Sequence, residues 1–309
     1  MTTAVSVVIE TDSVHEYDNI TFGDCLAAVA RQSYPPALVQ VIVVDGGKVP
    51  ALEALVRRNF PNAIVLPLPG GTKFEQKNLG MDAATGEIVA FLDGDCAPPP
   101  TWLAAIVEGL AAAPPEVAGL QGITVLSDGF LSRELSALFY GPRRRGGELR
   151  ASRLVTDNCA FRTAVLRRFR FEHAEFSTVV DTLFLRRLER AGYRVRVSDE
   201  LRMAHSFPGA TWDGLVWFFA RAFGVGYYMV KARQVEPDLR GRALVRWGGL
   251  GWPLLALGKC VVDVRQVWEN RRRVGARFTL ALPATAVYEL TLFLGGLAAL
   301  LRIPPPRWA

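Results

Sequence analysis

The first third of the chain alternates short apolar runs with helical patterns, and this alternation limits the fold more than any other feature. Val39–Asp45 (VQVIVVD) and Glu87–Asp93 (EIVAFLD) are almost uninterrupted apolar runs, as expected for strands that are covered on both faces. Segments with helical spacing separate these runs, so the pattern predicts an α/β fold with a mainly parallel sheet and crossover helices. The predicted strands are Val5–Glu10, Val39–Asp45, Ala63–Leu68 and Glu87–Asp93. The predicted helices are Phe22–Arg31, Phe74–Ala84 and Thr101–Ala113, with Thr101 as the N-cap of the last one.

The alternation becomes less regular in the middle of the chain. The patterns predict strands at Val117–Leu126, Leu154–Arg162 and Tyr193–Val197, a loop at Gly141–Arg150, and an amphipathic helix at Asp181–Ala191 that Gly192 ends. From Trp212 onward the composition changes to long apolar stretches interrupted by basic residues. We therefore expect two domains, a catalytic domain at residues 1–210 and a membrane-associated helical region at residues 211–309.

Charge and cysteine usage limit the partners and the compartment. The net charge is +6, which favours an anionic partner such as a diphosphate substrate or an anionic lipid headgroup. Aromatic and arginine residues do not interleave in a repeating strip, so nucleic acid is not an expected partner. The cysteines are scattered without a CxxC pair, and the N-terminus lacks a basic region followed by an apolar segment. These features predict a reduced compartment and a catalytic part on the cytoplasmic side.

Two carboxylates follow the strand at Glu87–Asp93. The sequence Asp93-Gly94-Asp95 is placed where ligands bind in open α/β sheets, beyond the carboxyl ends of the strands. An Asp-x-Asp loop leaves most of the coordination of a hard cation open for diphosphate oxygens and water, as Mg²⁺ or Mn²⁺ requires. On its own the motif favours a simple turn in which Asp93 caps a helix and Asp95 is solvated.

The order of several motifs gives a more specific indication. The strand at Val5–Glu10, the segment VIVVDGG, and the segment KFEQKNLGMDAATGEIVAFLDGDCAPPPTWL follow one another. At these residues the chain closely resembles the family 2 glycosyltransferases, and the resemblance extends from about Val5 to Phe207. It implies a GT-A fold, with C-terminal apolar helices added here.

The resemblance also implies roles in binding a nucleotide-sugar. Asp45 corresponds to the carboxylate that reads the nucleobase, and Lys77-Asn78 to the basic residue and Asn beside the nucleoside. Asp93 would contact ribose and metal, and Asp95 would bind the metal. Glu10 and Gly94 belong to the same donor-binding set. Gly46, Gly47 and Lys48 stand where the family usually has a further Asp and a Ser or Thr, which weakens the assignment of the base and ribose contacts.

Three further segments match the family pattern. Asp157-Asn158 precede Cys159-Ala160-Phe161-Arg162 and resemble an acceptor-side segment, although a plain polar turn explains them equally well. Asp181 corresponds to the catalytic base, with a helix cap as the alternative, and Val180 replaces the Glu that usually precedes it. His205 matches a histidine near the metal or diphosphate, and a packing or surface histidine is the equal alternative. Arg221 matches a basic residue that offsets diphosphate charge, but a helix-surface arginine near lipid is slightly favoured.

Together these residues predict an inverting, metal-dependent transfer of one sugar. A UDP-linked sugar is the expected donor, with Asp93, Asp95 and His205 as ligands of Mg²⁺ or Mn²⁺. Asp181 would remove the proton from the acceptor hydroxyl. A degenerate, non-catalytic membrane scaffold is one alternative. A nucleotidyltransferase is another, but it lacks support because ETDSVHEYDN, after the first strand, is not a glycine-rich phosphate loop.

The C-terminal region predicts contact with a membrane. Trp247–Gly258 is too short to span comfortably, and Phe278–Leu301 is long enough. Arg271–Arg273 lie between them, and the positive-inside tendency favours keeping these arginines at the cytoplasmic face near anionic lipid. We therefore expect an interfacial or re-entrant helix near residues 247–262 and a spanning helix at 278–301. A lipid-linked or membrane-proximal acceptor, in cell-envelope polysaccharide or glycolipid synthesis, would follow. The alternative is that these helices pack on the catalytic domain or on a second copy of the chain.

Overall fold

The computed structural model describes residues 3–127, 129, 131–141, 143–145, 148–150, 154–176, 178–209, 211–236, 239, 241–246 and 251–305. The chain forms two compact units. Unit 1 comprises Met1–Ser127, Pro142–Phe176 and Val180–Phe207, and unit 2 comprises Asp128–Gly141, Ser177–Val179 and Pro208–Ala309. Unit 2 thus includes a helix from within the segment predicted to be catalytic, α5 (Ser132–Tyr140).

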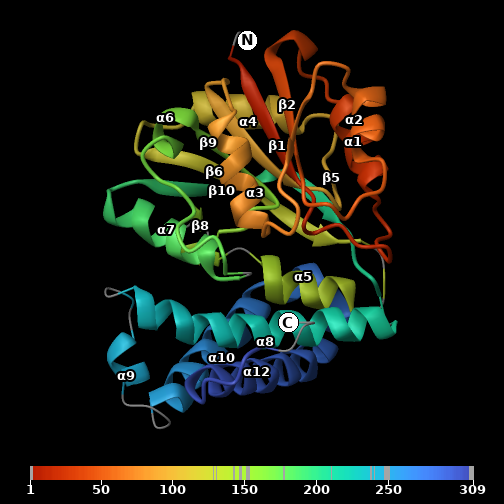
Figure 1. Ribbon diagram of the computed structural model, residues 1–309. Helices are drawn as coiled ribbons and strands as arrows, with labels where there is room; N and C mark the ends of the chain where they lie inside the picture. Colours follow the sequence, from red (N-terminus) through yellow and green to blue (C-terminus); the bar gives the residue numbers. More distant parts are fainter. Residues whose placement is uncertain are drawn as a thin grey trace. The chain divides into compact units, whose positions relative to one another are not determined.

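Unit 1 is built on a mixed, mostly parallel sheet with helices on both faces (Figure 1). The strand order is β3-β2-β1-β4-β9-β6-β10-β8-β7, and β5 pairs with β10 outside this path. The strands are β1 (Val5–Glu10), β2 (Val39–Asp45), β3 (Ile64–Pro67), β4 (Ile88–Asp93), β5 (Cys96–Ala97), β6 (Val117–Leu126), β7 (Arg143–Arg145), β8 (Glu148–Arg150), β9 (Asn158–Arg162) and β10 (Arg194–His205). Strands β3, β2, β1 and β4 are parallel neighbours, whereas β9 runs antiparallel between β4 and β6.

Alternating side chains of β1 contribute to two separate cores. Val7 and Ile9 belong to a core that also contains Cys25 and Trp102, from α1 (Phe22–Ala30) and α4 (Trp102–Ala111). Val8 points to the other face, into a core with residues of α3 (Lys73–Asp82) and α7 (Val180–Arg190). Because both faces are covered, the strands read as continuous apolar runs in the sequence. The remaining helices of unit 1 are η1 (Pro36–Leu38), α2 (Leu52–Asn59) and α6 (Thr163–Leu166).

Helices α1 and α3 both begin with capping boxes. Thr21 and Asp24 cap α1, and Thr72 and Glu75 cap α3, each by reciprocal side-chain to backbone hydrogen bonds. Thr101 occupies the predicted N-cap of α4, but its side chain makes no capping hydrogen bond. The start of α3 is therefore defined by hydrogen bonds between neighbouring residues, and this sets the position of the buried Lys77 along the helix.

Three predicted elements differ from the structure. The predicted strand at Leu154–Arg162 begins only at Asn158, and the predicted loop at Gly141–Arg150 contains the paired strands β7 and β8. The predicted strand at Tyr193–Val197 continues as β10 to His205. The polar segment Ser198–Glu200 breaks the alternation at the point where the register against β6 shifts, between Val197 and Arg202. Beyond this segment the alternation resumes at Leu201–His205, and pairing with β6 and β5 makes the whole stretch one strand.

Unit 2 is helical. Besides α5 it contains α8 (Trp212–Val235), α9 (Arg242–Arg246), α10 (Gly251–Glu269), α11 (Arg271–Val274), η3 (Gly275–Arg277) and α12 (Phe278–Leu300). Glycines allow α8 and α12 to pack closely, because a Cβ at Gly226 would lie 1.9 Å from the carbonyl oxygen of Leu292. Trp252 of α10 donates from Nε1 to the carbonyl of Phe293 at 2.8 Å. These contacts join the three long helices of the unit (Figure 1).

The predicted C-terminal apolar helix is present, whereas its insertion into a membrane stays a prediction. Among the described residues one helix, α12, has the length and apolar composition needed to cross a membrane. Residues 247–250 of the first predicted segment lie outside the described residues. From Gly251 onward that segment forms α10, which continues to Glu269 and is therefore longer than the apolar stretch.

Candidate functional site

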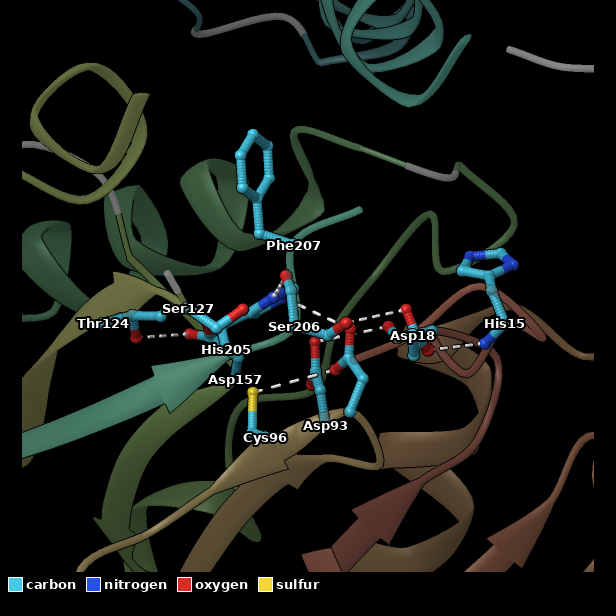
Figure 2. Close-up of polar contacts among 12 residues, drawn as sticks. His15, Asp18, Asp93, Cys96, Thr124, Ser127, Asp157, His205, Ser206 and Phe207 are labelled. Atoms are coloured by element: carbon cyan, nitrogen blue, oxygen red, sulfur yellow. Dashed lines mark hydrogen bonds and ion pairs between the residues drawn. The ribbon is translucent and has the colours of Figure 1, made fainter. Parts of the chain in front are cut away.

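Ionisable side chains meet at one edge of the sheet in unit 1. Glu10 ends β1 and is the register partner of Asp93, which ends β4. Asp157 directly precedes β9, whose first residue pairs with Leu92 of β4. His205 ends β10. Since β9 is antiparallel, its beginning lies at the edge where β1, β4 and β10 end, so the sheet order alone gathers these four groups. Figure 2 shows three of them, Asp93, Asp157 and His205.

Asp93 is paired with Lys77 inside the protein. The Lys77 Nζ contacts Asp93 Oδ1, and the lysine side chain is fully buried. Burial alone would raise the pKa of Asp93, but the Lys77 charge outweighs it and lowers this pKa to about 2. The other oxygen, Oδ2, accepts a hydrogen bond from the Ser13 hydroxyl at 3.3 Å. The first aspartate of the DGD sequence is thus ionised and engaged by protein groups, and its role as a metal ligand stays a prediction.

Glu10 lies beside this pair in an unfavourable environment for a charge. Its Oε2 accepts from the backbone N–H of Asp12 at 2.7 Å and of Ser13 at 3.2 Å. Its Oε1 is 4.0 Å from Lys77 Nζ and accepts no hydrogen bond from the described residues. Complete burial, followed by the charge of Asp93, raises the pKa of Glu10 to about 8.

Asp95, Cys96 and His205 form the second half of the site. Pairing of β5 with β10 places Cys96 opposite His205, and the donor atoms of the three side chains all lie within 4.8 Å of one another. His205 Nε2 is 3.6 Å from Asp95 Oδ2, while its Nδ1 lies 2.7 Å from the Ser206 carbonyl oxygen. Such a carbonyl contact fixes the imidazole so that Nε2 is the ligating nitrogen.

The protonation of this triad is shifted by burial and by its neighbours. Burial raises the pKa of Asp95 to about 7, with Asp93, Asp18 and Asp157 adding to the shift and His205 opposing it. Burial lowers the pKa of His205, but the charges of Asp95 and Asp157 outweigh it, so this pKa is raised. Burial also raises the pKa of the Cys96 thiol well above its usual range. The raised pKa values of Asp95, Cys96 and His205 therefore favour the protonated forms of these three side chains near neutral pH.

Asp157 adds another buried carboxylate. Its Oδ1 accepts from the Thr124 hydroxyl at 3.3 Å, whereas its Oδ2 accepts no hydrogen bond from the part of the chain that the structure describes. Burial raises the pKa of Asp157 to about 6. Its predicted role on the acceptor side stays a prediction.

The charges at this edge do not balance. Glu10, Asp93, Asp95 and Asp157 are buried carboxylates, whereas Lys77 is the buried lysine beside them and His205 the buried histidine. Buried charges require partners, and an excess of buried carboxylates is relieved by protonation or by a cation. The carboxylate, imidazole and thiol of Asp95, His205 and Cys96 therefore fit a divalent metal ion.

A polar network that the sequence did not reveal holds His205 in place. The Ser206 hydroxyl donates to Asp18 Oδ1 at 2.9 Å, and the Phe207 N–H donates to Asn19 Oδ1 at 3.0 Å. The Ser127 hydroxyl also donates to Asn19 Oδ1, at 2.8 Å. The loop after β1 is thereby fastened to the end of β10, as Figure 2 shows. The only local signal was the polar composition of EYDN.

Two predicted site residues are used within the protein. The Asn78 amide donates to the Phe171 carbonyl at 2.9 Å and accepts from the Phe171 N–H at 3.1 Å. Asn158 accepts from Trp102 Nε1 at 2.9 Å and donates to the Leu201 carbonyl at 2.8 Å. Both amides thus join separate segments of unit 1, and the ligand contacts predicted for them stay predictions.

The carboxyl end of β2 shows what the Gly46-Gly47-Lys48 sequence does. Asp45 Oδ1 accepts from the Gly47 N–H at 2.8 Å, and Gly47 has a positive φ of 81°. Lys48 Nζ lies 2.8 Å from Asp12 Oδ1. Asp45 therefore ends its strand in a tight turn that leaves its carboxylate partly exposed.

Gly94, Asp181 and Arg221 complete the predicted set. A Cβ at Gly94 would lie 2.7 Å from Val14 Cγ2 and 2.9 Å from the Glu10 carbonyl oxygen, so the DGD turn requires glycine. Asp181 lies in the first turn of α7, and its Oδ1 accepts from the Thr182 N–H at 2.6 Å. Arg221 belongs to unit 2, where its guanidinium lies 4.7 Å from the centroid of the Phe139 ring.

Known proteins share sequence with this chain. A model of glycosyl transferase family 2 matches residues 19–175, about half of the chain. Glycosyltransferase AglE of Haloferax volcanii is 36% identical over 104 residues, which are 32% of this chain and 33% of AglE. The chain thus matches about a third of the length of this curated relative.

Solved structures share the fold. Mannosyltransferase PcManGT from Pyrobaculum calidifontis, in complex with GDP-Man and Mn²⁺, matches with a TM-score of 0.61 and 17% identity over 98% of this chain and 89% of that chain. TarS of S. aureus, residues 1–349 in complex with UDP, matches with a TM-score of 0.48 and 15% identity over 96% of this chain and 90% of that chain, too weakly to carry an argument. At these identities the likeness shows the fold alone. The family match over half of the chain and the GT-A-like architecture show that this protein belongs to glycosyl transferase family 2.

Proposed function

We propose that this protein transfers a single sugar from a metal-bound nucleotide-sugar, expected to be UDP-linked, to an acceptor hydroxyl with inversion at the anomeric carbon. The observation that carries the proposal is the row of buried acids at the carboxyl edge of the sheet, next to the Asp95–Cys96–His205 triad. This is the edge at which open α/β sheets bind ligands. The complex of PcManGT with GDP-Man and Mn²⁺ supports such a ligand for a protein of similar fold.

Asp95 and His205 would hold Mg²⁺ or Mn²⁺, with Cys96 and Asp93 nearby. When bound, the ion would neutralise charge on the diphosphate leaving group. The imidazole favours Mn²⁺ over Mg²⁺, because Mg²⁺ prefers an all-oxygen shell. The protein's own contribution is to hold these groups rigidly, through the Ser206 carbonyl at His205 and the Lys77 pair at Asp93.

The remaining roles fall to residues around this edge. The bond between the anomeric carbon and the diphosphate oxygen breaks, and its electron pair leaves with the nucleoside diphosphate. The acceptor oxygen forms the new bond from the opposite face, and Asp181 takes its proton as general base. Asp45 would accept from a ring N–H of the nucleobase. One displacement with one base gives inversion.

A lipid-linked or membrane-proximal acceptor, at the cytoplasmic face of a membrane, is the acceptor class we propose. It is supported by the apolar composition and length of α12. Arg221, stacked on aromatic rings in unit 2, is the basic residue that we propose to offset the diphosphate charge, and a donor-bound structure tests this role.

A screen of UDP- and GDP-sugars tests the proposal. Full-length protein with Mn²⁺ and a native lipid extract should transfer or hydrolyse one donor, and chelation should abolish turnover. Asp181→Asn should retain donor binding and lose turnover, whereas Asp95→Asn should lose metal-dependent binding. NMR of the product that shows retained anomeric configuration would refute inversion. Calorimetry that detects no binding of any nucleoside diphosphate with Mn²⁺ would instead support a non-catalytic scaffold.

A further inference from the structure

Unit 2 carries an unusual distribution of exposed apolar side chains. In α10, Leu254, Leu257 and Val261 have exposed fractions of 57%, 62% and 61%. Their spacing of three and four residues places them along one side of the helix. In α12, Leu290 and Leu294 are exposed by 62% and 49% on a similar stripe. Water-soluble surfaces rarely present contiguous apolar stripes of this kind.

The interior of the same helix pair is charged. Lys259 Nζ contacts Asp263 Oδ2 and lies 3.5 Å from Glu289 Oε1. The exposed fractions of the Asp263 and Glu289 side chains are only 1% and 7%. This charged cluster therefore lies between α10 and α12, beside buried apolar side chains such as Trp252 and Tyr288, whereas the outer sides of both helices carry the exposed apolar side chains.

Helix α7 of unit 1 shows the opposite arrangement. Arg186, Glu189 and Arg190 are exposed, and Leu183 and Phe184 are buried. This is the pattern of a helix whose outer side meets water. The same chain thus contains a helix whose exposed side is charged and a helix pair whose exposed side carries apolar stripes, so these stripes are not a matter of overall composition.

Toward its C-terminal end the surface of α10 changes from aliphatic side chains to aromatic and basic ones, as expected at a membrane interface. Trp268 is 55% exposed, and the Arg271 guanidinium lies 4.6 Å from the centroid of its ring. The Arg265 side chain is 71% exposed. Tryptophan and arginine next to an apolar helix surface are typical of the headgroup level, where arginine also meets anionic phosphates.

We infer that the outward faces of α10 and α12 contact the acyl chains of a lipid bilayer, with Trp268, Arg265 and Arg271 at the level of anionic headgroups. The Lys259–Asp263–Glu289 cluster is then shielded from lipid between the two helices, as ionisable groups within membranes are. The exposed aliphatic side chains of α10 run from Leu254 to Val264, and Arg265 follows them. Leu254 and Arg265 are about 16 Å apart along the helix axis at a rise of 1.5 Å per residue. Immersion of this length agrees with a helix that enters one leaflet. A second copy of the chain is the competing occupant, but basic side chains at the end of the stripe favour an anionic surface.

Vesicle flotation of the full-length protein tests the inference, and it does not depend on transferase activity. The protein should float with vesicles of phosphatidylcholine and phosphatidylglycerol, and more weakly with phosphatidylcholine alone. Leu257→Glu should weaken partitioning by about 10- to 100-fold, because a carboxylate in the acyl region is costly. Ala54→Glu, on the exposed side of α2 in unit 1, is the matched control and should leave partitioning unchanged.

Spin labels distinguish lipid from a protein partner. A nitroxide at Leu257→Cys, in a Cys260→Ser background, should be more accessible to oxygen than to a water-soluble nickel complex in vesicles. The other cysteines, Cys25, Cys96 and Cys159, are buried. A label that is more accessible to the nickel complex overturns the inference. So does one shielded from both reagents with dipolar broadening, which would show a contact between two copies.

Discussion

Lys77 Nζ and Asp93 Oδ1 form an ion pair inside the protein, with the lysine fully buried. Removing one partner leaves the other charge buried and uncompensated, which typically costs about 3–5 kcal/mol. We expect Lys77→Met to lower the free energy of unfolding by about this amount, measured by urea denaturation. Lys77→Met/Asp93→Asn should recover part of the loss. If the double variant is no more stable than the single one, the pair does not compensate charge as described.

The triad predicts which residues control metal affinity. Asp95→Asn and His205→Ala should each weaken Mn²⁺ binding by at least about tenfold, since each removes a ligating atom. Isothermal titration calorimetry measures this directly. Asp82→Asn is the control, because Asp82 is exposed and paired with Arg170 away from this edge. Unchanged affinity in both triad variants would exclude the triad as the metal site.

Glu10 predicts a pH dependence of stability. Its pKa in the folded protein, about 8, lies above the value expected in the unfolded chain. Its contribution is therefore fully present below the unfolded pKa and is lost as the pH rises towards about 8, by at most about 1.4 kcal/mol per pH unit. Glu10→Gln cannot ionise, so its stability relative to the wild type should increase between pH 5 and about pH 8. Thermal unfolding across this range provides the measurement, and parallel pH profiles for the two proteins would contradict the assignment.

The turn at Gly94 is sterically closed. A Cβ there would lie within 3.0 Å of both Val14 and the Glu10 carbonyl, and the carbonyl is backbone that cannot simply rotate away. Gly94→Ala should therefore destabilise by about 1–3 kcal/mol and weaken metal binding by displacing Asp95. Gly23→Ala, within α1, meets nothing closer than 3.5 Å and should be neutral or slightly stabilising. If the two substitutions shift the unfolding midpoint equally, the close contacts of a Cβ at Gly94 do not control stability.

Asp181 predicts a separation of chemistry from binding. Loss of a general base commonly costs about 10²- to 10⁴-fold in rate. Asp181→Asn should therefore reduce kcat by this amount and leave the affinity for nucleoside diphosphate with Mn²⁺ unchanged. A variant that loses donor affinity and keeps kcat would instead place Asp181 in donor binding, as a helix cap that shapes the pocket.

Several features of the site could be read from local sequence because they depend on local chemistry. The strands that end in Glu10, Asp45 and Asp93 were confirmed, since continuous apolar runs and the carboxylates that follow them are adjacent in the chain. Thr72 and Glu75 place the start of α3 by a capping box within four residues. The continuity of β10 from Val197 to His205 was not predicted, because the polar segment Ser198–Glu200 interrupts the alternation and only pairing with β5 and β6 bridges it.

Local sequence was sufficient to predict most strands and helices of the first third of the chain and the carboxylates that end them, because apolar periodicity and capping act between near neighbours. The charge arrangement of the site, by contrast, arises from tertiary packing. In the folded chain β9 pairs antiparallel with β4, which brings Asp157 to the edge of the sheet where the site lies. Asp93 pairs with Lys77, and Asp95 pairs with His205. Tertiary packing also placed Lys259, Asp263 and Glu289 between α10 and α12. These outcomes depend on burial and on pairing between distant segments, whose electrostatic consequences arise only when the chain is folded.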